Sequence, residues 1–201
     1  MIQSTTRIDT GNWLQSDDYF HKTYPTSIRL LAHKHWTPLA VARKAALFLA
    51  AENGSKILDI GSGVGKFCMA AAIIKPNSDF YGIEQRTDLI QHAESARTIL
   101  EVSNVTFIQG NVIQANRNDY NHFYFYNSFY ENLPGTEKID EHVTYSMDLY
   151  KCYYSTLYRQ LDKLSAGTRL ATFHSPEEEL PPGFHIVKTE FDTLLKFLVK
   201  E

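Results

Sequence analysis

Apolar residues in this chain follow two kinds of pattern. Runs of about 4–8 residues that end at glycine or at polar positions are typical of buried strands in a parallel sheet. Apolar residues three or four positions apart are typical of helices that cover such a sheet. The strands predicted in this way are Lys56–Ile60, Asp79–Ile83, Val105–Gln109, His122–Tyr126 and Arg169–Phe173, followed by a closing pair at His185–Phe191 and Leu194–Val199.

Four segments have helical spacing. We expect Thr37 to cap the first of these helices, with Pro38 in its opening position. Thr87 is expected to cap the third, where Asp88 in the first turn complements the helix dipole. The predicted helices cover about residues 37–53, 65–74, 87–100 and, as one long helix, 138–164.

The alternation of strands and helices predicts an α/β fold with a doubly wound, mostly parallel seven-stranded sheet. No helical pattern separates the last two strands, so an antiparallel edge is expected at the C-terminus. Residues 37–201 are predicted to form this domain, preceded by an arm or lid over residues 1–36. Ligands of such sheets bind beyond the carboxyl ends of the strands, near the point where the strand order reverses.

Composition narrows the class of protein. With 201 residues, 43% of them apolar, the chain suits a single domain with a sizeable core. No apolar run approaches the ~18 residues of a membrane span, and the first five residues do not resemble a secretory signal, so we expect a cytoplasmic protein without a membrane partner. The net charge of -3 and the absence of a basic cluster rank nucleic acid below other partners.

A glycine-rich loop follows the first predicted strand. Gly61, Gly63 and Gly65 lie between a strand and a helix, which is the setting in which glycines allow the backbone to approach a ligand. The spacing differs by one residue from the G-x-G-x-x-G of dinucleotide-binding proteins, with Lys66 where that motif has its third glycine. An NAD-dependent oxidoreductase is therefore the weaker alternative.

An acidic residue ends the second predicted strand. Glu84 lies 19 residues after Gly65, close to the separation of about 20 at which a carboxylate binds ribose hydroxyls in nucleotide-binding folds. An ionised carboxylate accepts from both hydroxyls at once. A surface acid at a strand end is the alternative, and the glycine loop upstream favours ribose binding.

The segment Asp59-Ile60-Gly61-Ser62-Gly63-Val64-Gly65 resembles the hallmark of class I S-adenosylmethionine-dependent methyltransferases. The resemblance is strongest over residues 56–86 and extends from about residue 37 to the C-terminus. It implies the Rossmann-like class I methyltransferase fold and S-adenosyl-L-methionine as the cofactor. The residues that it implies for cofactor binding are the loop residues Gly61, Ser62, Gly63 and Gly65 around the methionine part, Asp59 at the loop or at the amino group, Glu84 at the ribose, Gln85 beside the adenine, and Thr37 and Asn127 at the cofactor.

The end of the third predicted strand resembles the third motif of the same family. The residues are Gly110, Asn111 and Val112, and the family usually has aspartate where this chain has Asn111. The resemblance implies a hydrogen bond between the Asn111 side chain and the adenine amino group. An asparagine that merely stabilises a turn is the alternative.

The aromatic segment after the fourth predicted strand carries the expected acceptor chemistry. Asn127 and Phe129 resemble the Asn-x-Phe pattern of Dot1-like lysine methyltransferases and of amino-methyltransferases, whereas Ser128 departs from both. The Asn127 oxygen is expected to accept an N–H and fix the nitrogen lone pair toward the methyl group. Phe129 or Tyr130 would contact the nitrogen and the cofactor's positive charge, a cation–π contact worth about 0.5–2 kcal/mol. The alternative is that these aromatic residues form the cleft wall.

The sequence thus predicts a methyltransferase that methylates a nitrogen, on a protein side chain or a small amine. A non-catalytic protein of the same fold, binding a partner through residues 1–36, is kept as an alternative; intact cofactor motifs favour the enzyme. His33 and His35 form an H-x-H pair without further ligands, so no metal site is predicted.

Overall fold

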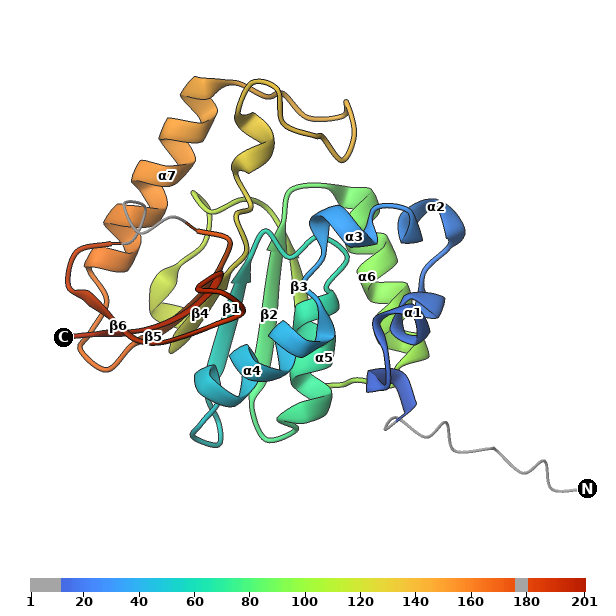
Figure 1. Cartoon of the computed structure of the whole chain (residues 1–201), viewed down its shortest axis with the longest axis horizontal. Helices are drawn as coiled ribbons and strands as arrows, with labels where there is room; N and C mark the ends of the chain where they lie inside the picture. Colours follow the sequence, from blue (N-terminus) through green and yellow to red (C-terminus); the bar gives the residue numbers. More distant parts are fainter. Residues whose placement is uncertain (1–11, 176–180) are drawn as a thin grey trace, which may run out of the picture.

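The computed structural model describes residues 12–175 and 181–201, apart from the side chains of Asn12, His33 and Lys34. Seven strands form one sheet in the order β3-β2-β1-β4-β5-β7-β6 (Figure 1). The predicted signal-free N-terminus and part of the predicted arm, residues 1–11, lie outside the described residues. The strands are β1 (Lys56–Ile60), β2 (Asp79–Glu84), β3 (Val105–Gln109), β4 (His122–Phe125), β5 (Arg169–Phe173), β6 (Phe184–Glu190) and β7 (Leu195–Lys200).

The strand pairing confirms the predicted doubly wound sheet with an antiparallel C-terminal edge. Strands β1 to β5 pair in parallel, and β7 runs antiparallel to both β5 and β6. The chain leaves β1 for β2 and β3 and then returns to β4 on the other side of β1. The strand order therefore reverses between β1 and β4, which is where ligands of such sheets bind.

Helices cover both faces of the sheet because successive strand residues point to opposite sides. Ile57 packs in one core cluster with α4, α5 and α6, whereas Leu58 and Ile60 pack in a second cluster with α7. None of the helices in the described part of the chain has the length and apolar character that crossing a membrane requires. The helices that cover the sheet are α4 (Leu39–Leu49), α5 (Lys66–Ile74), α6 (Thr87–Ile99) and α7 (Met147–Asp162).

The described N-terminal residues form short helical turns beside α5 and α6 (Figure 1). Phe20, Tyr24 and Trp36 are buried in the same core cluster as α4 and α5. The Tyr24 hydroxyl donates to the Val64 carbonyl of the glycine loop at 3.0 Å. These turns are η1 (Asn12–Leu14), α1 (Asp17–Phe20), η2 (His21–Thr23), α2 (Thr26–Arg29) and α3 (Ala32–His35).

Two predicted helix caps are wrong. Helix α4 begins at Leu39 with Pro38 before it, and its first amide donates to the Asp17 carboxylate at 3.0 Å. Thr37 instead shares a 3.0 Å hydrogen bond with the Tyr124 hydroxyl. Helix α6 begins at Thr87 itself, whose hydroxyl accepts from Gln109. In both cases the threonine hydroxyl is engaged by a residue distant in sequence, Tyr124 for Thr37 and Gln109 for Thr87, so it does not cap the helix.

The predicted long helix over residues 138–164 is shorter than expected. Helix α7 begins at Met147, because the Ser146 side chain accepts the Leu149 amide at 3.1 Å and caps the helix there. Residues 133–146 form an irregular segment, in which the Asp140 carboxylate accepts the His142 amide. Leu157 and Leu161 of α7 are buried in the same core cluster as Leu58 and Ile60 of β1.

His122 joins β4 to β5 and has to remain neutral in the folded protein. Its Nδ1 atom accepts the Arg169 amide at 3.0 Å, and the side chain is 9% exposed. Burial, together with the nearby Arg169 charge, lowers the pKa of His122 from 6.5 to about 4. As the pH falls, the unfolded chain therefore takes up this proton before the folded protein does.

We predict that His122→Asn reduces the acid sensitivity of the fold. The wild-type free energy of unfolding should fall between pH 6.5 and about 4, with a contribution of about 1–3 kcal/mol from His122. The side-chain oxygen of the substituted asparagine can accept the Arg169 amide but does not titrate. Urea unfolding at pH 7 and pH 4.5 measures the difference, with His185→Asn on exposed β6 as the control. An equal pH dependence in His122→Asn and wild type would contradict the prediction.

Candidate functional site

The loops that follow β1 to β4 enclose a cavity at the carboxyl edge of the sheet. Its volume of about 770 Å³ lies within the range of about 300–1,000 Å³ that is usual for ligand sites. The cavity brings together most of the residues predicted from the sequence to form the site. Those that line it are Gly61, Gly63, Glu84, Gln85, Gly110, Asn111, Val112, Asn127, Phe129 and Tyr130.

Gly61 permits the close contact between the loops after β1 and β4. Its φ is +74°, and an added Cβ would lie 2.4 Å from the Ser128 Cβ. The Ser128 hydroxyl donates to the Ile60 carbonyl at the end of β1. The serine that departs from both family patterns thus holds the aromatic segment against the glycine loop.

Gly65 has a packing role and lines neither this cavity nor the smaller one beside it. It precedes α5 with φ +74°, and an added Cβ would lie 2.2 Å from the Phe107 ring. The glycine therefore lets α5 approach β3 closely. Its predicted contact with a cofactor remains a prediction.

Glu84 places a buried carboxylate at the cavity. One oxygen accepts the Gly63 amide at 3.1 Å, and the other accepts the Arg86 amide at 2.9 Å. The residue is 5% exposed, and burial raises the pKa of its carboxyl, whereas the Arg86 amide and guanidinium act in the opposite direction. A carboxylate in this position, beside open backbone at Gly63, suits ribose hydroxyls.

Asp59 and Ser62 line the smaller cavity, which adjoins the glycine loop. Burial raises the pKa of Asp59 to about 8, and the Cys68 thiol donates to its carboxylate at 3.6 Å. Among the described residues, the buried Ser62 hydroxyl has no hydrogen-bond partner. An unpartnered hydroxyl and a buried carboxyl fit the polar amino-acid end of S-adenosylmethionine. Thr37 lines the same small cavity.

Asn111 stabilises a turn, as the alternative interpretation predicted. Its side-chain oxygen accepts the Ile113 amide at 3.0 Å, and its own amide donates to the Gln114 side chain at 2.9 Å. The residue nevertheless lines the cavity. Its contact with an adenine ring remains a prediction, now through the second lone pair of the oxygen or through the amide nitrogen.

Asn127 lies at the cavity wall in a left-handed backbone conformation with φ +41°. Its carbonyl accepts the Tyr130 amide at 3.0 Å, and no described residue takes its side-chain carboxamide. Phe129 is buried against Phe125 and Tyr153, with ring centroids 5.2 and 5.5 Å apart, so it is mainly cleft wall. Tyr130 is half exposed.

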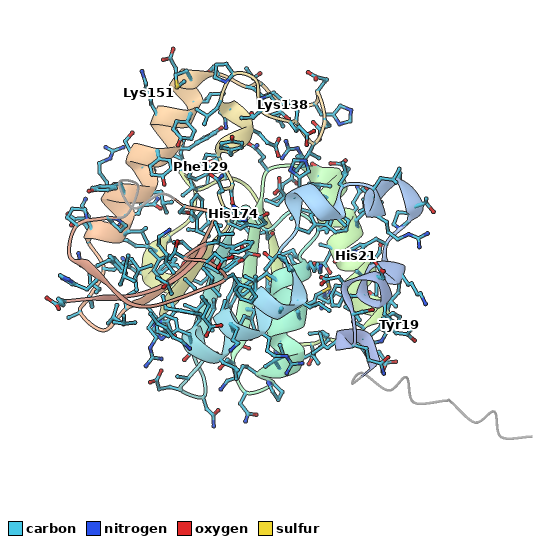
Figure 2. The ribbon with its side chains drawn as sticks, viewed as in Figure 1. Tyr19, His21, Phe129, Lys138, Lys151 and His174 are labelled. Carbon is cyan, nitrogen blue, oxygen red and sulfur yellow. The ribbon has the colours of Figure 1, made fainter. Side chains whose placement is uncertain are left out.

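The structure adds His174 to the site, which the sequence analysis missed. It follows β5, lines the cavity with φ +59°, and its ring lies 5.7 Å from that of Tyr126. Figure 2 shows His174 and Phe129 near the centre of the molecule, between α7 and the N-terminal turns. Burial and the Lys196 charge lower the pKa of His174, so its imidazole is neutral at neutral pH. Extending the strand-end rule to the fifth strand would have found it.

Arg86 was also missed, although it immediately follows the predicted Glu84 and Gln85. It is 6% exposed and lines the cavity beside Glu131. Trp36, Tyr126 and Ile139 line the cavity as well. These residues come from segments far apart in the chain, and no local pattern marks them.

Comparison with known proteins matches the "Methyltransferase domain" family model over residues 51–162. A tRNA (guanine-N(7)-)-methyltransferase of Microcystis aeruginosa is 42% identical over 55 residues, which are 27% of this chain and 26% of the relative. The matched part thus spans about a quarter of that protein.

Solved structures share the fold. An RNA methyltransferase from Salinibacter ruber, in complex with S-adenosyl-L-homocysteine, superposes with a TM-score of 0.56 at 21% identity, covering 82% of this chain and 91% of the other. A SAM-dependent O-methyltransferase from Thermotoga maritima has a TM-score of 0.55 at 16% identity, covering 88% of this chain and 71% of the other. At these identities, the likeness shows the fold alone.

We predict that Glu84→Gln weakens binding of S-adenosylhomocysteine at least tenfold. The amide keeps the shape but loses the charge, and a hydrogen bond to a charged group is worth about 1.5–3 kcal/mol. Isothermal titration calorimetry measures the dissociation constants. Glu94→Gln, in a partly exposed ion pair with Arg97 on α6, is the matched control. Equal affinity in Glu84→Gln and wild type would overturn the ribose assignment.

Proposed function

The chain belongs to the methyltransferase domain family and carries an S-adenosylmethionine-dependent methyltransferase domain, and we propose that it methylates a nitrogen of an amine or amide on a protein side chain or small molecule. The observation that carries the proposal is the Asn127 side chain at the cavity wall. No described residue takes its carboxamide, so its oxygen is available to accept an N–H from an acceptor.

The chain's own residues divide the work between cofactor and acceptor. Glu84 would hold the ribose hydroxyls, and Asp59 and Ser62 would meet the amino-acid end of the cofactor. When bound, S-adenosylmethionine supplies an electrophilic methyl group, and the electrons of the broken carbon–sulfur bond stay on sulfur. Asn127 would turn the nitrogen lone pair toward that methyl group, which is an orientation effect.

A proton has to leave the acceptor nitrogen during the reaction. The neutral imidazole of His174 has a free lone pair at one ring nitrogen and lines the same cavity as Asn127. We therefore assign His174 as the group that takes this proton. The backbone of His174 is fixed by its amide, which donates to the Leu194 carbonyl at 3.0 Å, and its ring lies against those of Tyr126 and Phe173.

Charges at the cavity favour an amine over a phosphate-bearing acceptor. Glu84, Glu131 and Glu137 line the cavity, and the cation Arg86 is already engaged by carboxylates. The aromatic residues Tyr126 and Tyr130 supply faces that attract a cationic or polarised amine. A nucleic acid would need Lys and Arg side chains at its phosphates.

Methylation of an RNA base is the second candidate. It is favoured by one specific observation: relatives by sequence and by structure are named as tRNA or RNA methyltransferases. Asn127 would then orient a base nitrogen. The phosphates would have to bind outside the acidic cavity.

The first test of the function is a transfer assay with S-adenosylmethionine labelled in its methyl group. Three acceptor pools are offered separately: small amines, peptides, and unmodified tRNA transcripts. We expect label on an amine or peptide nitrogen, identified by mass spectrometry of the product. Label on tRNA alone would replace the first candidate with the second.

We predict that Asn127→Ala separates binding from turnover. Affinity for S-adenosylhomocysteine should stay within about threefold, because Asn127 acts on the acceptor. Turnover with the acceptor identified in the transfer assay should fall at least a hundredfold. This loss corresponds to a small part of the about 7–11 kcal/mol by which orientation can lower a barrier. Asn118→Ala, on the distant turn η3 (Arg117–Asp119), is the control. Normal turnover by Asn127→Ala would remove the orienting role.

A further inference from the structure

Arg86 joins two parts of the site that are separate in sequence. It lies two residues after Glu84 and directly precedes α6. Its backbone amide donates to one Glu84 oxygen at 2.9 Å, and its Nη1 atom lies 3.6 Å from the same oxygen. Arg86 is therefore tied to the carboxylate assigned to the ribose.

The rest of the guanidinium contacts residues 130–146, which we call the cover segment. Nη2 donates to the Glu131 carboxylate at 2.5 Å and to the Tyr145 hydroxyl at 2.8 Å. Nε donates to the Asp140 carboxylate at 2.8 Å. One side chain thus holds the cover segment near its start, its middle and its end.

The cover segment forms a wall of the cavity between β4 and α7. In Figure 1 it runs beyond the carboxyl ends of β1 and β2. Most of its internal hydrogen bonds come from side chains: the Lys138 ammonium donates to the Glu131 and Leu133 carbonyls, and the Tyr145 hydroxyl donates to the Asp140 carbonyl. Apart from the short turn η4 (Tyr130–Asn132), it has no helix or strand. The residues that it gives to the cavity are Tyr130, Glu131, Asn132, Gly135, Thr136, Glu137 and Ile139.

The charges explain why Arg86 can be buried here. A buried guanidinium is unfavourable unless carboxylates and hydrogen bonds compensate it, and Glu84, Glu131 and Asp140 surround this one. Glu131 and Asp140 are themselves only 14% and 15% exposed at their side chains. Without Arg86, three carboxylates would face one another with little water between them. The cover segment could then relieve the repulsion by moving away from β2.

We propose that Arg86 is a positioning residue that ties the cover segment to the ribose-side carboxylate of Glu84, so that cofactor binding and the placement of the acceptor wall are coupled. The coupling rests on the proposed function, because it requires the cofactor at Glu84. Coupling of this kind is reciprocal: a ligand that orders the segment binds less tightly when the link is removed.

The link is tested first in the ligand-free protein by hydrogen exchange with mass spectrometry. In Arg86→Gln, amides of the cover segment should exchange about tenfold faster than in wild type. The control Arg97→Gln removes a partly exposed arginine from α6, the helix that follows Arg86, and should leave this segment unchanged. Equal exchange in Arg86→Gln and wild type would overturn the proposal, whether or not the cofactor binds.

A second variant tests the same link without changing Arg86, in case Arg86→Gln does not fold. Glu131→Gln with Asp140→Asn leaves Arg86 and Glu84 in place and removes the charges on the cover side. We expect the same faster exchange in the cover segment, with unchanged exchange in the strands. If the segment stays as protected as in wild type, Arg86 does not hold it through these ion pairs.

The coupling is tested with S-adenosylhomocysteine as the probe. In wild type, the probe should slow exchange in the cover segment; in Arg86→Gln, its affinity should fall about tenfold and this protection should disappear. Equal protection by the probe in both proteins would contradict the coupling. If the wild-type protein does not bind S-adenosylhomocysteine, both the proposed function and the coupling are contradicted. The ligand-free exchange comparison still decides whether Arg86 holds the cover segment.

Discussion

Burying the Glu84 carboxylate at the end of β2 removes it from water, and the chain compensates with two backbone amides and one guanidinium. One amide comes from Gly63, which fixes the glycine loop against β2. The guanidinium comes from Arg86, which in turn requires further carboxylates and draws in the cover segment. A single buried charge thus places the glycine loop, the end of β2 and one wall of the cavity relative to one another.

The strands could be predicted from the sequence because a buried strand is marked by its own run of apolar residues. Strands β1, β3 and β5 have the predicted bounds, since runs of apolar residues end where the chain meets the cavity or solvent. The positions of the glycine loop and of Glu84 were readable for the same reason, because both are fixed by backbone geometry within one strand–helix–strand unit. Even there, the structure separates roles, because Gly65 packs against Phe107 and leaves the cavity to Gly61 and Gly63.

The remaining features depend on contacts between distant residues. The Thr37 hydroxyl is hydrogen-bonded to Tyr124, and the Asp17 carboxylate accepts the first amide of α4. Local capping rules therefore chose the wrong residue for the start of this helix. The start of α7 was misplaced because helical spacing continues through residues that Arg86 and Tyr145 hold in an irregular segment. The only local signal at His174 is its place directly after β5, and the order of the strands brings that strand end to the cavity.

The same division explains why the acceptor is harder to infer than the cofactor. Cofactor recognition uses backbone conformations that any chain of this fold must adopt, and these leave glycines at fixed spacing. In the function we propose, acceptor recognition uses side chains of the cover segment and of the β4 and β5 ends, whose chemistry is free to vary while the fold is kept. In this chain those side chains are acidic, aromatic and amide-bearing, and the one buried cation among the described cavity residues holds the wall in place. A wall held by ion pairs leaves little positive charge for phosphates inside the cavity, and this is the physical argument behind our proposal of an amine acceptor.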